Sequence, residues 1–265
     1  MVPCLPLLIL LILLTPGVSG AAAQGCRGCH PVHYVDRGSC ISCHRGDDRT
    51  DRKRIAHYRL IPARYAAFTL PGSVRVERGK KLLERYGCRR CHMAGKQGTS
   101  LAASLDRLGG KEPGQLAAAM DKPALYMPTF HVAPQERDDL VNYLMWLGRE
   151  GRVKGQETPA VVHFSRTERD REHPFVKRCG GCHKALTEGH GGVGAGDIGP
   201  NLSGLFTPFY PRPFREGEPW TSQRLREWLK NPRKVRTMAV MPPVVLEEGE
   251  LERIAELLNI SPQVR

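Results

Sequence analysis

Four copies of one five-residue pattern constrain this chain more than any other feature. Residues 26–30, 40–44, 88–92 and 179–183 each have the sequence Cys-x-x-Cys-His. Together they use eight of the nine cysteines, and only Cys4 lies outside them. Random placement of nine cysteines and ten histidines in 265 residues would give on the order of 0.01 copies of the pattern. The chain therefore repeats one chemistry four times.

This pattern is the attachment signature of c-type haem. Its two thiols form thioether bonds with the porphyrin, and the histidine that follows binds the iron as proximal ligand. Zinc sites also use Cys-x-x-Cys pairs, but neither zinc sites nor disulfides require a histidine after every second cysteine. Thioredoxin-like redox motifs need a βαβ setting, which the sequence does not suggest. The sequence thus predicts four covalently bound haem c groups. The haem-attaching cysteines are Cys26, Cys29, Cys40, Cys43, Cys88, Cys91, Cys179 and Cys182, and the proximal ligands are His30, His44, His92 and His183.

The N-terminus carries the features of a secretory signal. Residues 5–14 form an apolar run, and small residues follow at 19–23, as at a signal-peptidase site. The run is short for a membrane span, and no Lys or Arg precedes it. A cleaved signal peptide over 1–23 is therefore expected, and an uncleaved N-terminal anchor is the alternative. The chain resembles multihaem c-type cytochromes, which acquire haem outside the cytoplasm, so the resemblance also implies a periplasmic or otherwise exported protein.

Residues 24–72 hold two of the motifs in too little chain for two hydrophobic cores. The haems themselves must then act as the core and staple the segment. His33 and His57 are its remaining histidines, and the segment has no methionine, so these two are the expected sixth ligands of its two irons. Which histidine serves which iron stays open. The segment resembles the closely packed bis-histidine haem pairs of small multihaem cytochromes from metal-respiring bacteria.

Residues 73–150 follow a different plan. Helices are predicted over 74–86 and 134–148, and the second has an apolar stripe at i, i+3, i+4 and i+7. A Met-Pro loop lies between them. The layout resembles the class I cytochrome c domain, and that resemblance implies that Met127 is the sixth iron ligand. Met120 and His131 are the alternatives.

After a polar linker over 151–171, residues 172–265 resemble a second class I cytochrome c domain. Helices are predicted from 222 to about 231 and over 251–258. Met241 precedes a proline, as Met127 does, and matches the family's iron ligand, with Met238 as the alternative. Trp220 and Trp228 are expected in the core or haem pocket. The remaining histidines are expected to be solvated surface residues: His163, His173 and His190.

These features together predict a mainly α fold with little or no sheet. It comprises a small haem-stapled segment followed by two class I cytochrome c-like helical domains. No catalytic residue is assigned, because every iron has a candidate sixth ligand. The resemblance implies an electron carrier between respiratory partners, one version of which is the cytochrome subunit of a membrane quinol-oxidising complex. The alternative is a haem enzyme with one open iron, of peroxidase or reductase type.

The charge of the chain bears on its partners. The formal net charge is +13, and four ferric haems with ionised propionates would lower it to roughly +9. Long-range steering then favours acidic redox partners, or peripheral association with a membrane surface. Nucleic acid, the other common partner of a basic protein, is not expected for an exported haem protein.

Overall fold

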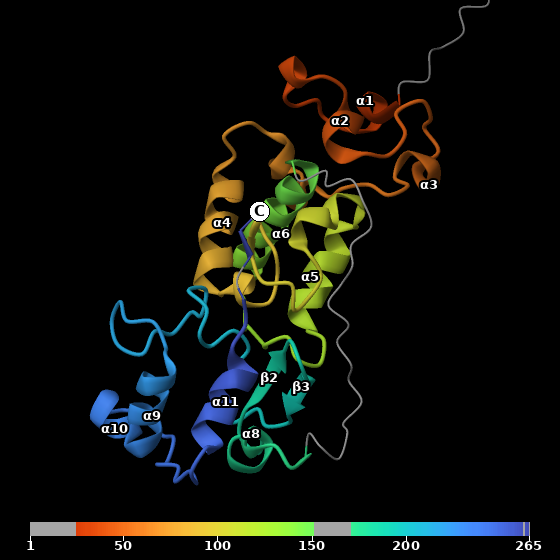
Figure 1. Ribbon diagram of the computed structural model, residues 1–265. Coiled ribbons are helices and arrows are strands. Elements are labelled where there is room, and N and C mark those ends of the chain that lie inside the picture. The colour runs from red at the N-terminus through yellow and green to blue at the C-terminus, as the bar shows by residue number, and fades with distance from the viewer. Residues whose placement is uncertain (1–24, 151–170, 262, 265) are drawn as a thin grey trace, which may run out of the picture. The chain divides into compact units, whose positions relative to one another are not determined.

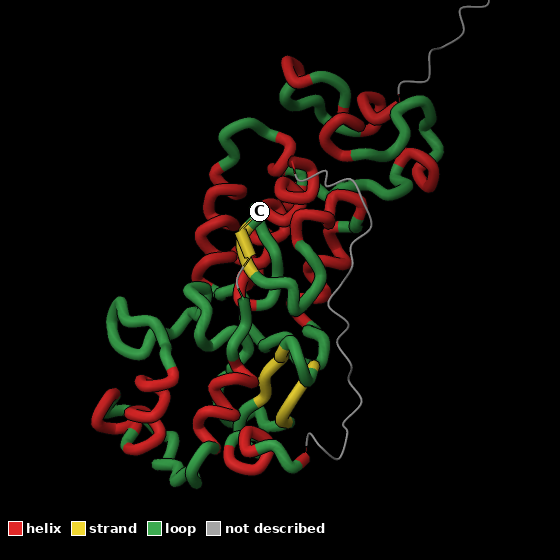
Figure 2. The backbone as a smooth tube through the Cα atoms, in the orientation of Figure 1, coloured by secondary structure: helices red, strands yellow, loops and turns green. Residues whose placement is uncertain are grey.

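The computed structural model describes residues 25–150, 171–261, 263 and 264 (Figures 1 and 2). The predicted signal peptide, nearly all of the predicted linker and His163 lie outside the described residues. The chain forms two compact units, Met1–Leu60 and Ile61–Arg265. Both are mainly helical, which confirms the predicted fold class. No helix within the described ranges is long and apolar enough to cross a membrane.

In the smaller unit, the described residues 25–60 form four short helical elements. They are α1 (Gly25–Cys29), the 3₁₀ helix η1 (Val35–Arg37), α2 (Cys40–His44) and α3 (Lys53–Ala56). Among its described residues only Gly25 and Ala56 are buried. These residues therefore form no apolar core of their own.

The larger unit contains the longer helices and two short antiparallel sheets. Its elements up to residue 150 are η2 (Ala63–Tyr65), η3 (Ala67–Thr69), α4 (Val74–Arg85), η4 (Cys88–Arg90), β1 (Gln97–Gly98), η5 (Leu105–Gly110), α5 (Pro113–Asp121) and α6 (Pro134–Glu150). Those from residue 171 are α8 (Pro174–Arg178), β2 (Lys184–Thr187), β3 (Gly191–Gly194), α9 (Ser222–Lys230), α10 (Pro232–Val235), α11 (Glu250–Leu258) and β4 (Gln263–Val264). We call residues 61–150 the N-terminal half of this unit and residues 171–264 its C-terminal half.

Helices α4 and α6 cross and form the core of the N-terminal half, and both match the helices predicted from the sequence. Leu83 and Val141 are fully buried in this core. Gly79 lets the helices approach closely, because a Cβ there would lie 2.1 Å from the carbonyl oxygen of Asp139. A side chain at position 79 would therefore push the two helices apart.

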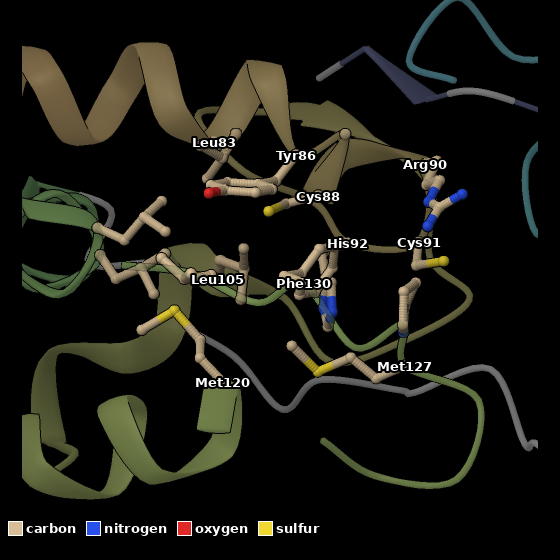
Figure 3. A pocket seen from close by; sticks show the side chains of 15 residues that line it. Leu83, Tyr86, Cys88, Arg90, Cys91, His92, Leu105, Met120, Met127 and Phe130 are labelled. Carbon is tan, nitrogen blue, oxygen red and sulfur yellow. The ribbon is translucent and has the colours of Figure 1, made fainter. Parts of the chain in front are cut away.

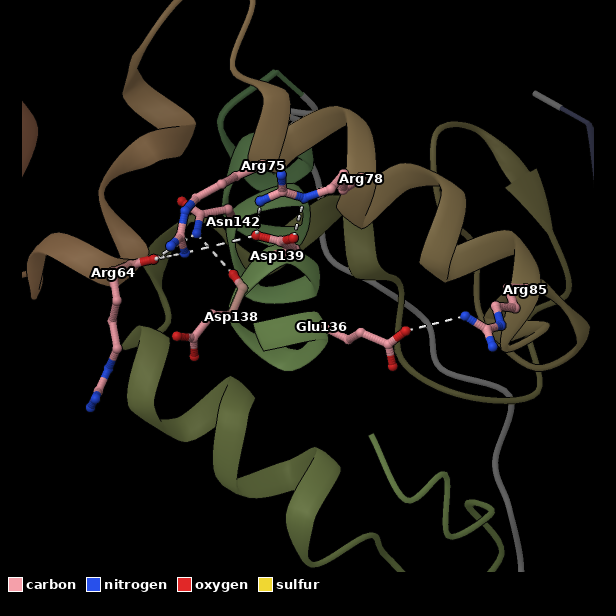
Figure 4. A network of polar contacts seen from close by, with 8 residues as sticks. All are labelled: Arg64, Arg75, Arg78, Arg85, Glu136, Asp138, Asp139 and Asn142. Carbon is pink, nitrogen blue, oxygen red and sulfur yellow. Dashed lines mark hydrogen bonds and ion pairs between the residues drawn. The ribbon is translucent and has the colours of Figure 1, made fainter. Parts of the chain in front are cut away.

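The segment before α4 packs onto α6 through a buried asparagine (Figure 4). The Asn142 Nδ2 donates to the carbonyl oxygens of Arg64 and Asp138, both at 2.8 Å, and its Oδ1 accepts from the Phe68 amide at 3.0 Å. Asp139, on the next position of α6, binds Arg78 of α4 with an N–O distance of 2.6 Å. The larger unit therefore begins at Ile61, whereas the sequence placed a domain boundary between residues 72 and 73.

In the C-terminal half, α9 and α11 match the two predicted helices. Thr221 caps α9 by accepting a hydrogen bond from the Arg224 amide. The glycine-rich stretch after residue 183 forms the antiparallel hairpin β2–β3. Two hydrogen bonds of the Thr187 hydroxyl stabilise its turn. The hydroxyl accepts one from the His190 amide and donates the other to the Gly191 carbonyl oxygen.

An ion pair joins α8 to α11 and makes the stability of the C-terminal half dependent on pH. Arg178 contacts Glu250 at 3.1 Å and Glu247 at 2.8 Å. The pKa of Glu250 is lowered by the hydrogen bond from the Glu247 amide and by Arg178. A carboxylate whose pKa is lower in the folded state stabilises the fold when the pH is above its ordinary pKa. This stabilisation is lost as the pH falls through the lowered pKa of the folded state.

We therefore expect Glu250→Gln to lower the melting temperature at about pH 7, and the difference from wild type to become smaller at acidic pH, where the carboxylate is protonated. Thermal unfolding followed by circular dichroism across this range measures both quantities. Glu248→Gln, whose carboxylate is exposed, is the matched control. An equal difference at both pH values would contradict the assignment.

Candidate functional site

A pocket lies in the N-terminal half against α4 and α6 (Figure 3). Its wall is mostly apolar, from residues such as Leu83, Leu140 and Leu144. The polar and sulfur-containing side chains in its wall are Tyr86, Cys88, Arg90, Cys91, His92, Met120 and Met127. The cavity thus combines two thiols, one imidazole and two thioethers in an apolar setting.

The His92 imidazole is oriented to bind a metal through its Nε2 atom. Its Nδ1 lies 2.7 Å from the carbonyl oxygen of Ala103. This carbonyl is an acceptor, so Nδ1 carries the proton and Nε2 keeps its lone pair for a metal. Such a partner also fixes the ring orientation and makes the imidazole a stronger donor.

Burial keeps the two thiols of this motif neutral. It raises the pKa of Cys88 to about 12 and also raises the pKa of Cys91. An apolar wall disfavours thiolates. It is suited to thioethers, which carry no charge, and therefore fits cysteines that are bonded to a porphyrin.

The loop between α5 and α6 brings Met127 into the cavity below His92 in Figure 3. Met120, on α5, lines the cavity as well, so the pocket wall contains both methionines. Met93 is buried directly after His92. His131 is exposed, whereas its neighbours Phe130 and Val132 line the wall.

The donor set of the pocket fits a haem c held by Cys88, Cys91 and His92, with Met127 as the predicted sixth ligand.

Comparison with known families bears on this site. Residues 74–144 match the family model described as cytochrome C oxidase, cbb3-type, subunit III. The match supports a c-type cytochrome domain over this segment, which we call the cytochrome c domain. The match includes the motif at 88–92 and supports covalent haem c and electron transfer for the cytochrome c domain. Neither the curated proteins nor the solved structures gave a match to the chain.

The C-terminal half repeats the proximal geometry of the cytochrome c domain. The His183 Nδ1 lies 2.8 Å from the carbonyl oxygen of Pro200, as His92 does from Ala103. A glycine packs on the backbone of each histidine. A Cβ at Gly98 would lie 2.1 Å from the His92 oxygen, and one at Gly194 would lie 2.2 Å from the His183 oxygen. Both imidazoles therefore have Nδ1 occupied and Nε2 directed to a possible metal.

Of the two candidate methionines in this half, the structure favours Met241 over Met238. The side chain of Met238 is 89% exposed, whereas Met241 packs against the core that contains Cys179. The Trp228 indole Nε1 donates a hydrogen bond to the Met241 sulfur at 3.0 Å. Trp228 in turn packs edge-to-face on Trp220, which is buried. The two tryptophans thus lie in or against the core, and Trp228 holds Met241 in place. Trp228 therefore has a role beyond the packing that was expected of it.

In the smaller unit, the four histidines form two pairs. The ring centroids of His30 and His57 are 5.8 Å apart, and those of His33 and His44 are also 5.8 Å apart. Bonds from a metal to imidazole nitrogen are about 2 Å long, so two imidazoles on opposite sides of one metal have centroids roughly 6 Å apart. The pairs fit bis-histidine coordination, with one motif histidine in each pair.

His173 differs from the sequence-based expectation of a solvated histidine. It is buried, and its Nδ1 caps α8 by accepting a hydrogen bond from the Phe175 amide. The position before a proline that starts a helix is the signal that could have predicted this role. His190 lies beside it, with the ring centroids 5.6 Å apart.

Gly199 packs closely against the proximal histidine of the C-terminal half. A Cβ there would lie 2.2 Å from the Cε1 atom of the His183 ring. We expect Gly199→Ala to displace the imidazole and to destabilise the fold by about 1–3 kcal/mol through overpacking. Visible spectra and thermal unfolding measure the two effects. Gly181→Ala is the control, because no atom lies within 4 Å of a Cβ at that position. Equal behaviour of the two variants would refute this role of Gly199.

Proposed function

We propose that the chain is an exported tetrahaem c-type cytochrome that carries electrons between respiratory partners. One observation carries the proposal: each motif histidine of the smaller unit is paired with a second histidine. His57 lies beside His30 and His33 beside His44. Met241 packs against the core that includes Cys179. Four motifs with four candidate sixth ligands support four six-coordinate irons.

The role of the protein residues follows from their placement. When bound, haem supplies reversible one-electron exchange between ferrous and ferric iron. The cysteines hold it covalently, and the carbonyls of Ala103 and Pro200 orient the proximal imidazoles. The apolar wall around Leu83 and Leu140 excludes water and limits the reorganisation that a change of charge would cause. An iron held by a motif histidine together with a second histidine or a methionine would have no position left for a substrate.

The ligand sets imply a difference in reduction potential along the chain. Methionine as the sixth ligand raises the potential of a haem, so the His/Met irons lie above the bis-histidine pair. Electrons that enter at the smaller unit would therefore move downhill to the larger one. The small unit also depends on its haems, since only Gly25 and Ala56 are buried among its described residues.

The charge and the N-terminal sequence extend the proposal to partners and location. The net charge of +13 favours acidic redox partners or a peripheral membrane association. The apolar run at 5–14 supports export to the periplasm. The protein would carry electrons in this way as the cytochrome subunit of a membrane quinol-oxidising complex, for example.

The haem count tests the proposal. The full chain, exported in a host that matures c-type cytochromes, should carry four haems by intact mass and by haemochrome absorption. A variant with Cys179→Ala and Cys182→Ala should carry three, as should one with Cys40→Ala and Cys43→Ala. A wild-type count of one would restrict haem binding to the cytochrome c domain and overturn the tetrahaem proposal.

A further inference from the structure

A buried junction joins the two halves of the larger unit next to both proximal motifs. Arg90 lies between the two cysteines of the motif at 88–92 and is 6% exposed. Its Nη1 donates to the carbonyl oxygen of Asn201 at 3.0 Å. The Tyr210 hydroxyl lies 3.2 Å from the same oxygen, and the Arg90 guanidinium lies 5.4 Å from the Tyr210 ring centroid. The junction therefore binds the haem-attachment segment of one half to the backbone of the other.

The side chain of Asn201 reaches the methionine loop of the N-terminal half. Its Nδ2 donates to the carbonyl oxygen of Tyr126 at 2.9 Å, and Tyr126 directly precedes Met127. Its Oδ1 accepts from the Ser203 amide at 2.9 Å, which fixes the amide group. Asn201 is only 8% exposed, so water does not compete freely for these contacts.

The residue before Asn201 contacts the proximal histidine of the C-terminal half. The carbonyl oxygen of Pro200 is the partner of His183 Nδ1. One peptide unit therefore separates the hydrogen bond to His183 from the residue that binds both Arg90 and Tyr126. Few chemical bonds connect the proximal ligand of one iron with the cysteine motif and the methionine loop of the other.

We propose that Asn201 is a positioning residue that couples the iron site at His92 with the iron site at His183. This inference rests on the proposed function, since it requires a haem at both sites. Haem bound at both sites would supply a one-electron exchange, in which one iron is oxidised as the other is reduced. No bond forms or breaks, and no proton moves. Asn201 and Arg90 hold the two sites in the geometry on which the rate of this exchange depends.

The chain offers a matched control for Arg90. Arg89 also lies between Cys88 and Cys91 and is 7% exposed, but its contacts stay within the N-terminal half. Its Nε donates to the Ala94 carbonyl oxygen at 2.8 Å, and it forms an ion pair with Glu84. Replacing either arginine with methionine removes one buried positive charge from the same motif. Only the Arg90 variant removes the contact with Asn201.

The experiment uses the full, haem-loaded protein in a partly reduced state. Two-dimensional exchange NMR on the methyl resonances of the axial methionines measures electron exchange between the two sites, and independence of dilution marks the exchange as intramolecular. We expect Asn201→Ala and Arg90→Met to slow this exchange about fivefold or more, because each loses a buried hydrogen bond that holds the junction closed. Asn201→Asp keeps the shape and the Ser203 contact but loses the donor to Tyr126, and should also be slower. Arg89→Met should stay within about twofold of wild type.

The outcomes separate this inference from the proposed function. If the folded, haem-loaded Asn201 variants exchange electrons as fast as wild type, Asn201 does not couple the sites. If Arg89→Met slows exchange as much as Arg90→Met, the loss of charge explains the effect and the inference is wrong. If the wild-type protein lacks haem at the motif at 179–183, the proposed function fails first and the inference fails with it.

Discussion

In the Met127→Ala variant we expect the haem at Cys88, Cys91 and His92 to lose its sulfur ligand and its reduction potential to fall by on the order of 0.1 V. The iron should become open to cyanide or carbon monoxide. The structure brings Met127 to the cavity that contains His92, and no other side chain of the Met-Pro loop offers a sulfur. Potentiometric titration and near-infrared magnetic circular dichroism measure the potential and the loss of iron–sulfur ligation.

Met120→Ala is the matched control for this prediction. Met120 is the same residue type and lines the same cavity, but it lies on α5 rather than in the Met-Pro loop. We expect this variant to keep iron–sulfur ligation and the ability to exclude external ligands. If Met120→Ala opens the iron and Met127→Ala does not, the ligand is Met120 and the resemblance has assigned the wrong methionine.

A second large effect is expected in the smaller unit. His57→Ala should convert the iron bound by His30 from low-spin to high-spin, because the two imidazoles form a pair. His33→Ala should do the same for the iron bound by His44. In each case the other iron of the unit should stay low-spin, and EPR spectra of the oxidised protein distinguish the two species.

The motif cysteines allow each high-spin signal to be assigned to one haem. Combining His57→Ala with Cys26→Ala and Cys29→Ala removes the haem that His57 would serve, so the high-spin signal should disappear. The same cysteine changes combined with His33→Ala should leave the high-spin signal in place. The reverse result would show that the histidines serve the opposite irons.

Local sequence patterns were sufficient for much of the fold. The sequence predicted α4, α6, α9 and α11 to within a few residues of their ends, and an apolar stripe marked α6. The repeated Cys-x-x-Cys-His pattern identified the attachment residues, because that chemistry depends on neighbours in sequence. These features require no knowledge of long-range contacts.

Features that depend on distant residues were not predicted. The attachment of residues 61–70 to α6 needs Asn142, which lies 74 positions after Phe68. The hairpin β2–β3 is rich in glycine, which lacks the side chains that mark a strand. The pairing of His57 with His30 and the contact of Arg90 with Asn201 likewise depend on tertiary structure. In these cases the sequence supplied candidate residues, and packing selected the partners.

The most direct test of the tetrahaem carrier counts the ligand set of every iron. Low-temperature EPR combined with near-infrared magnetic circular dichroism on the oxidised, exported protein distinguishes bis-histidine from histidine–methionine irons. We predict two low-spin irons of each kind and no high-spin iron. A stoichiometric high-spin, five-coordinate iron that binds cyanide in the resting protein would contradict the carrier and would favour a haem enzyme with an open site.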